Sequence, residues 1–364
     1  MRIAFILPTF TAGGAERVAS LLCNYWVEQG HDVTALTFEG AGDERVYHLD
    51  DRVTLRGIDA LNRSRRLSSR VGINLRRLVR LRATLKAFKA DAIVAFTTEA
   101  NLVAIWSALG LGVPVVVSER NQPDRPGLGR LTRAVRRLSY PLAAALVVQT
   151  EGIAQGVRAR FGAPVHVLPN PIRLAAWSGE PRADQATKRI VAVGRLVPQK
   201  GFAALITSFA ALADDHRDWQ LVIYGEGTDR ESLEAAARRL SLGDRIALPG
   251  VSKDMRAAFA AADLFVLPSR YEGYPNVLLE ALASGCAVIA TDCPGGTAEI
   301  LGGGKYGVLV EPENPAALTT ELQRMMSNQA LRRQFAAQAR EAVSALDVGA
   351  VGRRWLQLFA SLAG

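Results

Sequence analysis

The chain has 364 residues, of which 49% are hydrophobic and 22% are charged. This composition argues against disorder, and the length favours two domains of roughly 170–180 residues, each with its own core. No apolar run reaches the ~18–20 residues that a membrane-spanning helix needs, and the N-terminus has no signal-peptide pattern. We therefore expect a cytoplasmic protein. The net charge of +9 leaves nucleic acid, an anionic membrane surface and phosphorylated ligands open as partners.

Short apolar runs alternate with longer stretches of helical character along the whole chain. Such runs are typical of parallel strands buried on both faces, and their alternation with helices indicates βαβ units. The first half predicts strands at Arg2–Leu7, Val33–Phe38, Val53–Ile58, Ala92–Thr97, Pro114–Ser118, Leu146–Gln149 and Val165–Leu168. The second half predicts strands at Ile190–Val193, Leu221–Tyr224, Ile246–Leu248, Leu264–Pro268, Val288–Thr291 and Gly307–Val310. The fold class is α/β, with two Rossmann-like domains.

A polar stretch with Pro, Gly and charged residues at 170–188 separates the two halves, and we place the boundary there. The expected domains are 1–172 and 173–345, and 346–364 is expected to be a C-terminal helix that packs back toward the first domain. Doubly wound sheets bind ligands at the carboxyl ends of their strands. Two such domains can face those ends toward each other across a cleft, so the informative residues should lie in loops just after strands.

Cysteine and histidine give no sign of a metal centre. Cys23, Cys286 and Cys293 form no C-x-x-C pair, and the four histidines lie far apart in the sequence. Free cysteines of this kind behave as small hydrophobic residues. The sequence therefore predicts no metal site.

The first loop with a chemical signal is Thr11–Arg17, which follows the first strand and opens a helix to about Glu28. Gly13 and Gly14 let backbone N–H groups approach an anion, and a helix N-terminus adds partial positive charge. The pattern is not G-x-G-x-x-G, so it is no dinucleotide fingerprint. A simple tight turn is the alternative.

The second loop, Gly194–Gly201, follows the first strand of the second half. Arg195 and Lys200 lie on this Pro- and Gly-shaped segment, where two cations suit a diphosphate leaving group. The alternative is a pair of solvated surface charges.

The third segment, Ser269–Ala281, contains two glutamates with seven residues between them, Glu272 and Glu280. Gly273 and Pro275 shape a loop before a helix that begins at about Asn276, and amides near Tyr274 can cradle a phosphate. Glu280, one turn inside that helix, is placed to bind ribose hydroxyls. Glu226 lies in a further glycine-flanked turn, Tyr224–Thr228, for which an ordinary turn before a helix is equally good.

Together these motifs resemble the retaining glycosyltransferases of family four, which have the two-domain GT-B fold. The resemblance rests on GGAER, VGRLVPQKG, the GEG turn, EGYPNVLLEALASGCAVIAT, DCPGGTAEI and VLPNPI, and it spans essentially the whole chain. It implies an acceptor-binding first domain and a nucleotide-sugar-binding second domain. It also implies transfer with retention of anomeric configuration and without a bound metal or other cofactor, in agreement with the absence of a D-x-D motif.

The resemblance also assigns roles to individual residues. Gly13 and Gly14 would approach the donor by backbone, Arg195 and Lys200 would hold the diphosphate, and Glu272 would lie near the donor sugar. Glu280 would bind the ribose, and the donor site would include Glu226, Gly273, Tyr274 and Asn276. We expect Glu272, Arg195 and Lys200 to carry catalysis.

One segment departs from the family pattern. Many relatives have a histidine after the fifth strand, whereas this chain reads Ser118-Glu-Arg-Asn-Gln-Pro123. This version is similar to a subgroup that acts on polysaccharide or lipid-linked oligosaccharide precursors. We expect Glu119, Arg120 and Asn121 to contact the acceptor or the sugar, although Arg120 cannot act as a base. A surface ion pair of Glu119 and Arg120 is the alternative.

Lys and Arg are dense, and Asp and Glu are absent, between Arg63 and Lys89. Leu75, Leu78, Val79, Arg82 and Leu85 follow helical spacing and predict one stripe of an amphipathic helix, with the charges around it. Such a helix suits an anionic bilayer or the phosphates of a polyprenyl diphosphate-linked acceptor. The residues proposed for this contact are Arg70, Arg76, Arg77 and Arg80. An ordinary helix with a solvated basic face is the alternative, and the lack of aromatic–basic interleaving disfavours nucleic acid.

We therefore predict a peripheral membrane enzyme that transfers a sugar, with UDP-N-acetylhexosamine as the leading donor, to a lipid-linked glycan. Two other functions are compatible with the same fold. One is a nucleotide-sugar epimerase, and the other is a catalytically silent nucleotide-binding module.

Overall fold

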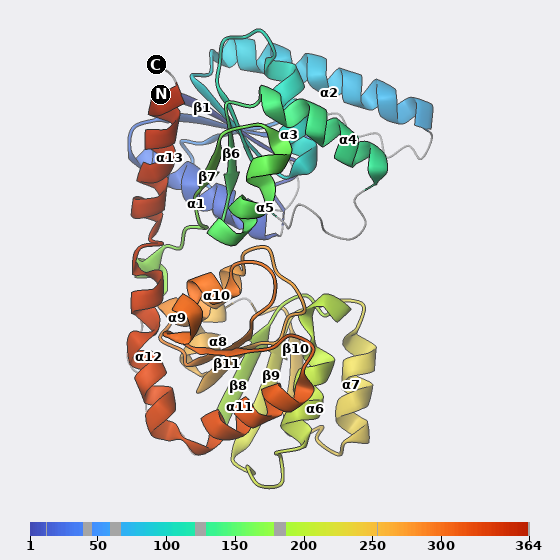
Figure 1. Ribbon diagram of the computed structural model, residues 1–364, viewed down its shortest axis with the longest axis vertical. Coiled ribbons are helices and arrows are strands. Elements are labelled where there is room, and N and C mark those ends of the chain that lie inside the picture. The colour runs from blue at the N-terminus through green and yellow to red at the C-terminus, as the bar shows by residue number, and fades with distance from the viewer. Residues whose placement is uncertain are drawn as a thin grey trace. The chain divides into compact units, whose positions relative to one another are not determined.

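The computed structural model describes residues 1–11, 13–38, 46–58, 67–120, 129–177, 187–252 and 254–362, and it gives the side chains of 67–74 no description. The chain divides into two compact units (Figure 1). The first consists of Met1–Pro171 together with Val348–Gly364, and the second of Ile172–Asp347.

A seven-stranded parallel sheet forms the centre of the first unit, in the order β3-β2-β1-β4-β5-β6-β7. Its central strands are nearly all apolar and buried on both faces, which is why helices cover both sides, whereas the edge strand β3 has exposed residues. The strands are β1 (Arg2–Leu7), β2 (Asp32–Thr37), β3 (Thr54–Gly57), β4 (Ala92–Phe96), β5 (Val115–Ser118), β6 (Ala145–Val148) and β7 (Val165–Val167).

Alternation along the strands directs side chains to two cores. Phe5 packs on one face with α1 (Gly14–Glu28) and α13 (Val348–Leu362), where Trp26 and Phe359 lie 5.4 Å apart between ring centroids. The neighbouring Ile6 faces the other core. The remaining helices are α2 (Leu67–Phe88), α3 (Thr98–Ala108), α4 (Arg130–Ser139) with the short η1 (Tyr140–Leu142), and α5 (Glu151–Phe161). The C-terminal helix α13 thus belongs to the first unit.

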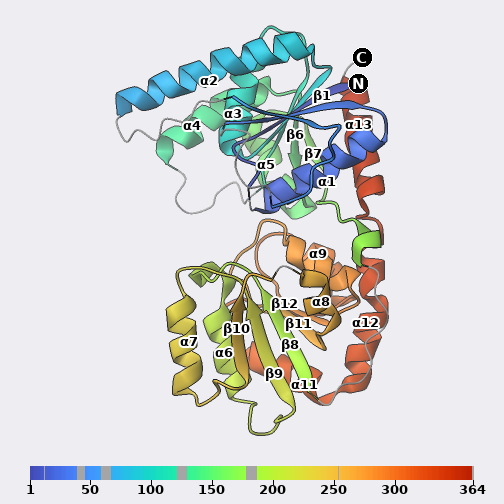
Figure 2. The same cartoon turned by 180° about the vertical axis from the view of Figure 1, so that it is seen from behind.

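The second unit has a six-stranded parallel sheet in the order β10-β9-β8-β11-β12-β13. Its strands are β8 (Lys188–Val193), β9 (Trp219–Tyr224), β10 (Ile246–Gly250), β11 (Leu264–Leu267), β12 (Val288–Thr291) and β13 (Val308–Val310). The helices are α6 (Phe202–Ala210), α7 (Arg230–Arg239), α8 (Met255–Ala260), α9 (Asn276–Ala283), α10 (Thr297–Ile300), α11 (Pro315–Ser327) and α12 (Gln329–Ser344), with short turns η2 (Leu174–Trp177), η3 (Pro198–Lys200) and η4 (Gly302–Gly304). Figure 2 shows the second unit from behind, with α8, α9 and α12 on the face opposite α6 and α7.

Each of the thirteen strands expected from the sequence is present in the described residues, and the prediction of two Rossmann-like α/β domains is confirmed. No helix among the described residues is long and apolar enough to cross a membrane. In both sheets the strand order reverses beside the first strand, between β1 and β4 and between β8 and β11. Doubly wound sheets bind their ligands outside such a switch point.

Candidate active site

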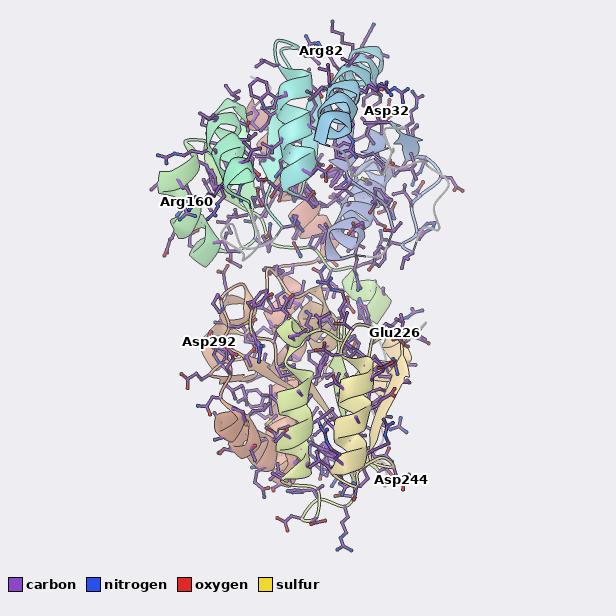
Figure 3. All side chains as sticks on the ribbon, turned by 90° about the vertical axis from the view of Figure 1, so that its right-hand side faces the viewer. Asp32, Arg82, Arg160, Glu226, Asp244 and Asp292 are labelled. Atoms are coloured by element: carbon purple, nitrogen blue, oxygen red, sulfur yellow. The ribbon has the colours of Figure 1, made fainter. Side chains whose placement is uncertain are left out.

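The loops of interest in the second unit all follow strands and share one end of the sheet. Figure 3 shows Glu226, which follows β9, and Asp292, which follows β12, at that end, with Asp244 at the opposite end. Lys200 follows β8 and Glu272 follows β11, the two strands that flank the switch point.

Lys200 and Glu272 form an ion pair at this switch point. The Lys200 Nζ lies 2.6 Å from Glu272 Oε1, and the two side chains are only 14% and 8% exposed. Ser269 Oγ donates a second hydrogen bond, also 2.6 Å, to the same oxygen. A buried carboxylate with a charged and a neutral donor has a fixed position. The structure therefore brings together two of the three residues predicted for catalysis.

Backbone contacts join the two loops that carry this pair. The Arg270 N–H donates to the Gln199 carbonyl at 2.8 Å, and Gln199 Nε2 donates to the Tyr271 carbonyl at the same distance. Gly201 ends the first loop in the left-handed region, with φ +68°. A Cβ at this position would overlap the carbonyl oxygen of Pro268. Only glycine fits there, so the loop is held tightly against the end of β11.

We expect Gly201→Ala to lower the free energy of unfolding by about 1–3 kcal/mol, because alanine is strained at positive φ and its Cβ would meet backbone. Displacement of the adjacent Lys200 should lower kcat/KM by roughly tenfold or more. Urea unfolding and steady-state kinetics would measure both effects. Gly243→Ala is the matched control, because a Cβ there meets nothing within 4 Å. Wild-type stability and activity of Gly201→Ala would contradict the tight fit.

Helix α9 begins beside the same loop and has no side-chain cap at Pro275. Its N-terminal amides and dipole favour an anion. Glu280 lies one turn inside α9 and is 4% exposed. Gly295 is at φ +139°, and a Cβ there would overlap the carbonyl oxygen of Glu272, so the loop after β12 packs on the loop after β11. Tyr274 and Gly273 lie in that packed loop.

The turn after β9 packs on the loop after β8. A Cβ at Gly225 would overlap the carbonyl oxygen of Gly194, and the Leu196 N–H donates to the Glu226 carbonyl at 2.9 Å. The exposed Glu226 carboxylate accepts from Arg230 at 2.7 and 2.8 Å, and these hydrogen bonds lower its pKa. Arg195 lies exposed in the same loop. The donor-binding roles of Glu226 and Arg195 stay predictions.

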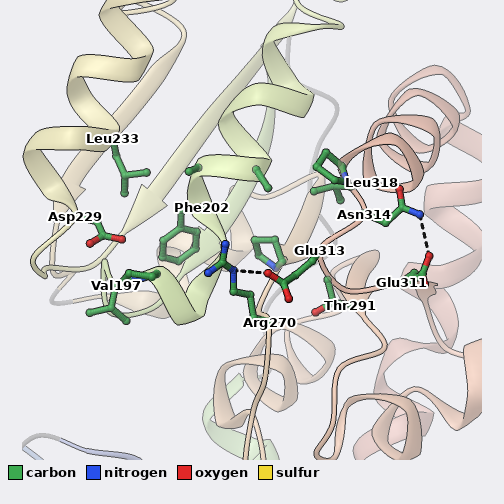
Figure 4. A pocket seen from close by; sticks show the side chains of 16 residues that line it. Val197, Phe202, Asp229, Leu233, Arg270, Thr291, Glu311, Glu313, Asn314 and Leu318 are labelled. Atoms are coloured by element: carbon green, nitrogen blue, oxygen red, sulfur yellow. Dashed lines mark hydrogen bonds and ion pairs between the residues drawn. The ribbon is translucent and has the colours of Figure 1, made fainter. Parts of the chain in front are cut away.

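A cavity of about 290 Å³ lies behind the two joined loops (Figure 4). Phe202, Leu233 and Leu318 line it from α6, α7 and α11, and Arg270 reaches across it to Glu313 at 3.2 Å. None of the residues predicted to bind the donor lines this cavity. Gly201, Pro268 and Arg270 of the two loops also line it, so the cavity adjoins the candidate site without containing its predicted donor-binding residues.

In the first unit, Gly13 and Gly14 lie at the start of α1, as the sequence predicts. The carboxylate of Glu16 folds back over Gly13, where a Cβ would overlap it, and accepts from Thr9 Oγ1 at 3.3 Å. A side-chain anion thus occupies the N-terminal end of its own helix, as a capping carboxylate does.

Glu119 corrects the sequence-based prediction. It is 3% exposed, and its carboxylate accepts from Tyr140, accepts from Thr98 Oγ1 at 3.2–3.3 Å and ion-pairs with Arg136 Nε at 3.5 Å. Three side chains of its own unit surround this buried carboxylate, so the structure does not support the predicted acceptor contact of Glu119, and the surface ion pair with Arg120 is wrong. Sequence reasoning missed Arg136, which lies 17 residues downstream in a stretch that reads as uniformly basic.

Arg120, next to Glu119 in the chain, is half-buried. Its guanidinium stacks 4.2 Å from the Phe96 ring centroid, and it donates to Ser118 Oγ at 3.4 Å and to Asn170. These contacts orient the cation at the carboxyl end of the sheet. Asn121 lies outside the described residues.

Helix α2 is present where the sequence predicts it, and its apolar stripe is divided between core and surface. Leu85 is buried and Leu78 packs against the core, whereas Leu75 and Val79 are 61% and 62% exposed. Arg77, expected on the solvated face, is 8% exposed. It ion-pairs with Glu99 and lies 4.7 Å from the Phe38 ring centroid. Arg77 is therefore part of the interior and is removed from the set of membrane contacts.

The other basic residues of α2 are placed differently from Arg77. Arg76 and Arg80 are exposed, and Arg80 Nη1 donates to the Ile58 carbonyl at 3.1 Å. Arg70 belongs to the part of α2 whose side chains the structure does not describe.

Comparison with known proteins gives a match for each unit. Residues 13–171 match the model of the glycosyl transferase 4-like domain, and residues 175–342 match that of the glycosyl transferases group 1. A Campylobacter jejuni relative, 26% identical over 100% of this chain and 99% of its own length, is an alpha-1,4-N-acetyl-D-galactosaminyltransferase named for a GalNAc-alpha-(1->4)-GalNAc-alpha-(1->3)-diNAcBac-PP-undecaprenol acceptor. The amylovoran biosynthesis glycosyltransferase AmsD of Erwinia amylovora is 25% identical over 89% of this chain and 90% of its own length.

Solved structures share the fold. Sucrose-phosphate synthase from Thermosynechococcus elongatus superimposes with a TM-score of 0.85 at 20% identity, covering 99% of this chain and 98% of that one. The Anabaena HepE protein, solved in complex with UDP, gives 0.81 at 17% identity over 99% of this chain and 100% of that one.

Proposed function

Because the chain belongs to the glycosyltransferases of the GT-B fold, we propose that it transfers a sugar from a nucleotide diphosphate donor to a polyprenyl diphosphate-linked glycan. We propose further that it is a family-four enzyme that retains the anomeric configuration and needs no metal. The relatives that bear on the acceptor are the undecaprenyl-linked N-acetylgalactosaminyltransferase and the amylovoran enzyme. The observation in this chain that carries the proposal is the Lys200–Glu272 pair at the switch point of the second sheet.

The second unit holds the donor in this proposal. Lys200 and Arg195 neutralise the diphosphate, the N-terminus of α9 adds its dipole, and Glu280 binds the ribose. Glu272 lies at the donor sugar, held in place by Lys200 and Ser269. The leading donor is a UDP-N-acetylhexosamine, because that class of sugar is named for the Campylobacter relative.

The chemistry breaks the bond between the anomeric carbon and the diphosphate oxygen. Positive charge develops on the sugar ring and negative charge on the leaving diphosphate, which Lys200 and Arg195 stabilise. The acceptor hydroxyl attacks from the face that the diphosphate leaves, and its proton passes to a phosphate oxygen of the departing nucleotide. The products are the extended glycan and the free nucleoside diphosphate.

The first unit binds the acceptor in this proposal. Arg120, oriented by Phe96 and Asn170, offers a cation for a sugar hydroxyl or an acceptor phosphate. The basic helix α2 attaches the protein to an anionic membrane, with Arg76 and Arg80 as the exposed contacts. Each basic residue close to such a surface contributes about 1 kcal/mol.

The test incubates purified protein and membranes that contain lipid-linked acceptors with radiolabelled UDP- and GDP-sugars, and counts label in the lipid extract. We expect lipid-bound label from one donor, and EDTA should not change its amount. When the anomeric configuration of the sugar in the donor is α, NMR of the product should show an α linkage. Altered nucleotide sugar without label in the lipid would instead indicate an epimerase. Label that EDTA abolishes would contradict the metal-independent mechanism.

A further inference from the structure

Exposed apolar side chains are concentrated on one part of the first unit. Twelve large hydrophobic side chains are exposed among the described residues, and only three of them belong to the second unit. Seven lie on α2, α3 and α4 or on the residues that directly follow α3 and α4, and these are Leu75, Val79, Trp106, Leu109, Leu131, Leu138 and Leu142. Exposed apolar groups that cluster in this way indicate an interaction surface.

The three helices that carry these residues lie side by side, as both ribbon views show (Figures 1 and 2). Trp106 on α3 donates its indole N–H to Ser139 Oγ on α4 at 3.0 Å. Neither α2 nor α4 contains an acidic residue, and the acid of α3, Glu99, is paired with Arg77. The Glu99 side chain is 57% exposed and is the one acid of these three helices, so the surface is apolar and carries a net positive charge.

Helix α4 carries the most exposed of these apolar side chains. Leu131 and Leu138, two turns apart, are 78% and 74% exposed. Arg130, Arg133 and Arg137 are also exposed, and at 100° per residue they lie on the outward face next to the leucines. In the isolated chain these two leucines are exposed to water beside the three arginines, and they contribute little to the buried core.

We infer that α4, flanked by the exposed residues of α2 and α3, docks the protein on an anionic lipid bilayer. Leucines at the acyl boundary with arginines at the headgroups give the apolar and electrostatic terms of interfacial binding. Trp106 has the amphipathic character of residues found at that depth. The positive charge favours an anionic surface over a second copy of this basic chain.

The docking surface on α2, α3 and α4 is connected to Arg120, the residue proposed to bind the acceptor. This part of the inference rests on the proposed function. The inner face of α4 carries Arg136, which pairs with Glu119 at 3.5 Å, directly before Arg120. A docked α4 therefore places the Glu119–Arg120 segment on the inner side of this helix, about 10 Å from the headgroup layer, where the diphosphate of a lipid-linked acceptor lies.

The experiment measures co-sedimentation of the full chain with vesicles of phosphatidylglycerol and phosphatidylcholine. Leu131→Ser with Leu138→Ser should lower binding at least about tenfold, and replacing Arg130, Arg133 and Arg137 by Gln should lower it on the order of 100-fold. The matched control changes an exposed helix end of the second unit, with Leu240→Ser, Arg238→Gln and Arg239→Gln. Circular dichroism confirms that each variant is folded.

Loss of binding in both α4 variants, with the control unchanged, supports the inference. Undiminished binding of the leucine variant would overturn it, as would a wild-type protein that ignores anionic vesicles. Light scattering without lipid tests the alternative of a dimer. If the wild type self-associates and the leucine variant does not, the inference of membrane docking is overturned. The assay contains no donor and no acceptor, so the proposed transfer reaction can fail while the docking surface stands, and the reverse.

Discussion

Lys200→Ala is expected to lower kcat/KM by about 10³-fold, or roughly 4 kcal/mol of transition-state stabilisation. The substitution removes a cation that faces the leaving diphosphate in the proposed mechanism. It also leaves the Glu272 carboxylate, 8% exposed, with the neutral Ser269 hydroxyl in place of a charged donor. A carboxylate that loses its charged partner in a buried position is destabilised. Steady-state kinetics with the donor found in the transfer assay would measure the effect.

The matched control is Lys188→Ala, which removes an ion-paired lysine of β8 whose Nζ lies 2.7 Å from Asp218 Oδ2. Lys188 lies at the amino end of β8, away from the candidate site, so kcat/KM should stay within about twofold. Lys200→Arg keeps the charge and should recover part of the activity. If Lys200→Ala and Lys188→Ala have equal kinetics, Lys200 has no special role in the reaction.

The sequence was sufficient for the architecture, because buried parallel strands leave a simple pattern. Near-continuous apolar runs such as Arg2–Leu7 and Val288–Thr291 are buried on both faces and coincide with β1 and β12. Glycine and charged residues after the runs Ile190–Val193 and Leu264–Pro268 indicated the loops that carry Lys200 and Glu272. Neighbouring strands in a parallel sheet end at one edge, and this geometry brings residues 72 positions apart into contact.

The sequence was not sufficient for side chains whose partners lie on other elements. The stripe predicted for α2 included Leu75 and Val79, yet the helix turns Arg77 inward, because Glu99 and the Phe38 ring receive its charge. Periodicity cannot anticipate a buried cation that is satisfied by a distant acid. The sequence also did not reveal the partners of Glu119. Arg136 and Tyr140 lie on α4 and η1, so the predicted acceptor contact did not take them into account.

The second large effect concerns the stability of this buried network. Glu119→Ala is expected to lower the free energy of unfolding of the first unit by about 3–5 kcal/mol, because it leaves Arg136, 2% exposed, without its buried counter-charge. Tyr140 also loses its acceptor, and since burial raises the pKa of its phenol well above the usual value, it stays a neutral donor. Hydrogen exchange with mass spectrometry would measure the loss of protection in β4–β6, with β8–β12 of the second unit as internal control.

A double variant separates the cost of a broken pair from the value of the pair itself. Glu119→Leu with Arg136→Met removes both charges and should recover more than half of the stability lost in Glu119→Ala, because an apolar replacement leaves no buried ion uncompensated. The contrasting pair is Arg270–Glu313, whose side chains are 51% and 64% exposed. Glu313→Ala should change stability by less than about 1 kcal/mol, because water replaces the partner at an exposed site. Equal losses for Glu119→Ala and Glu313→Ala would mean that burial of the Glu119–Arg136 pair does not determine its energetics.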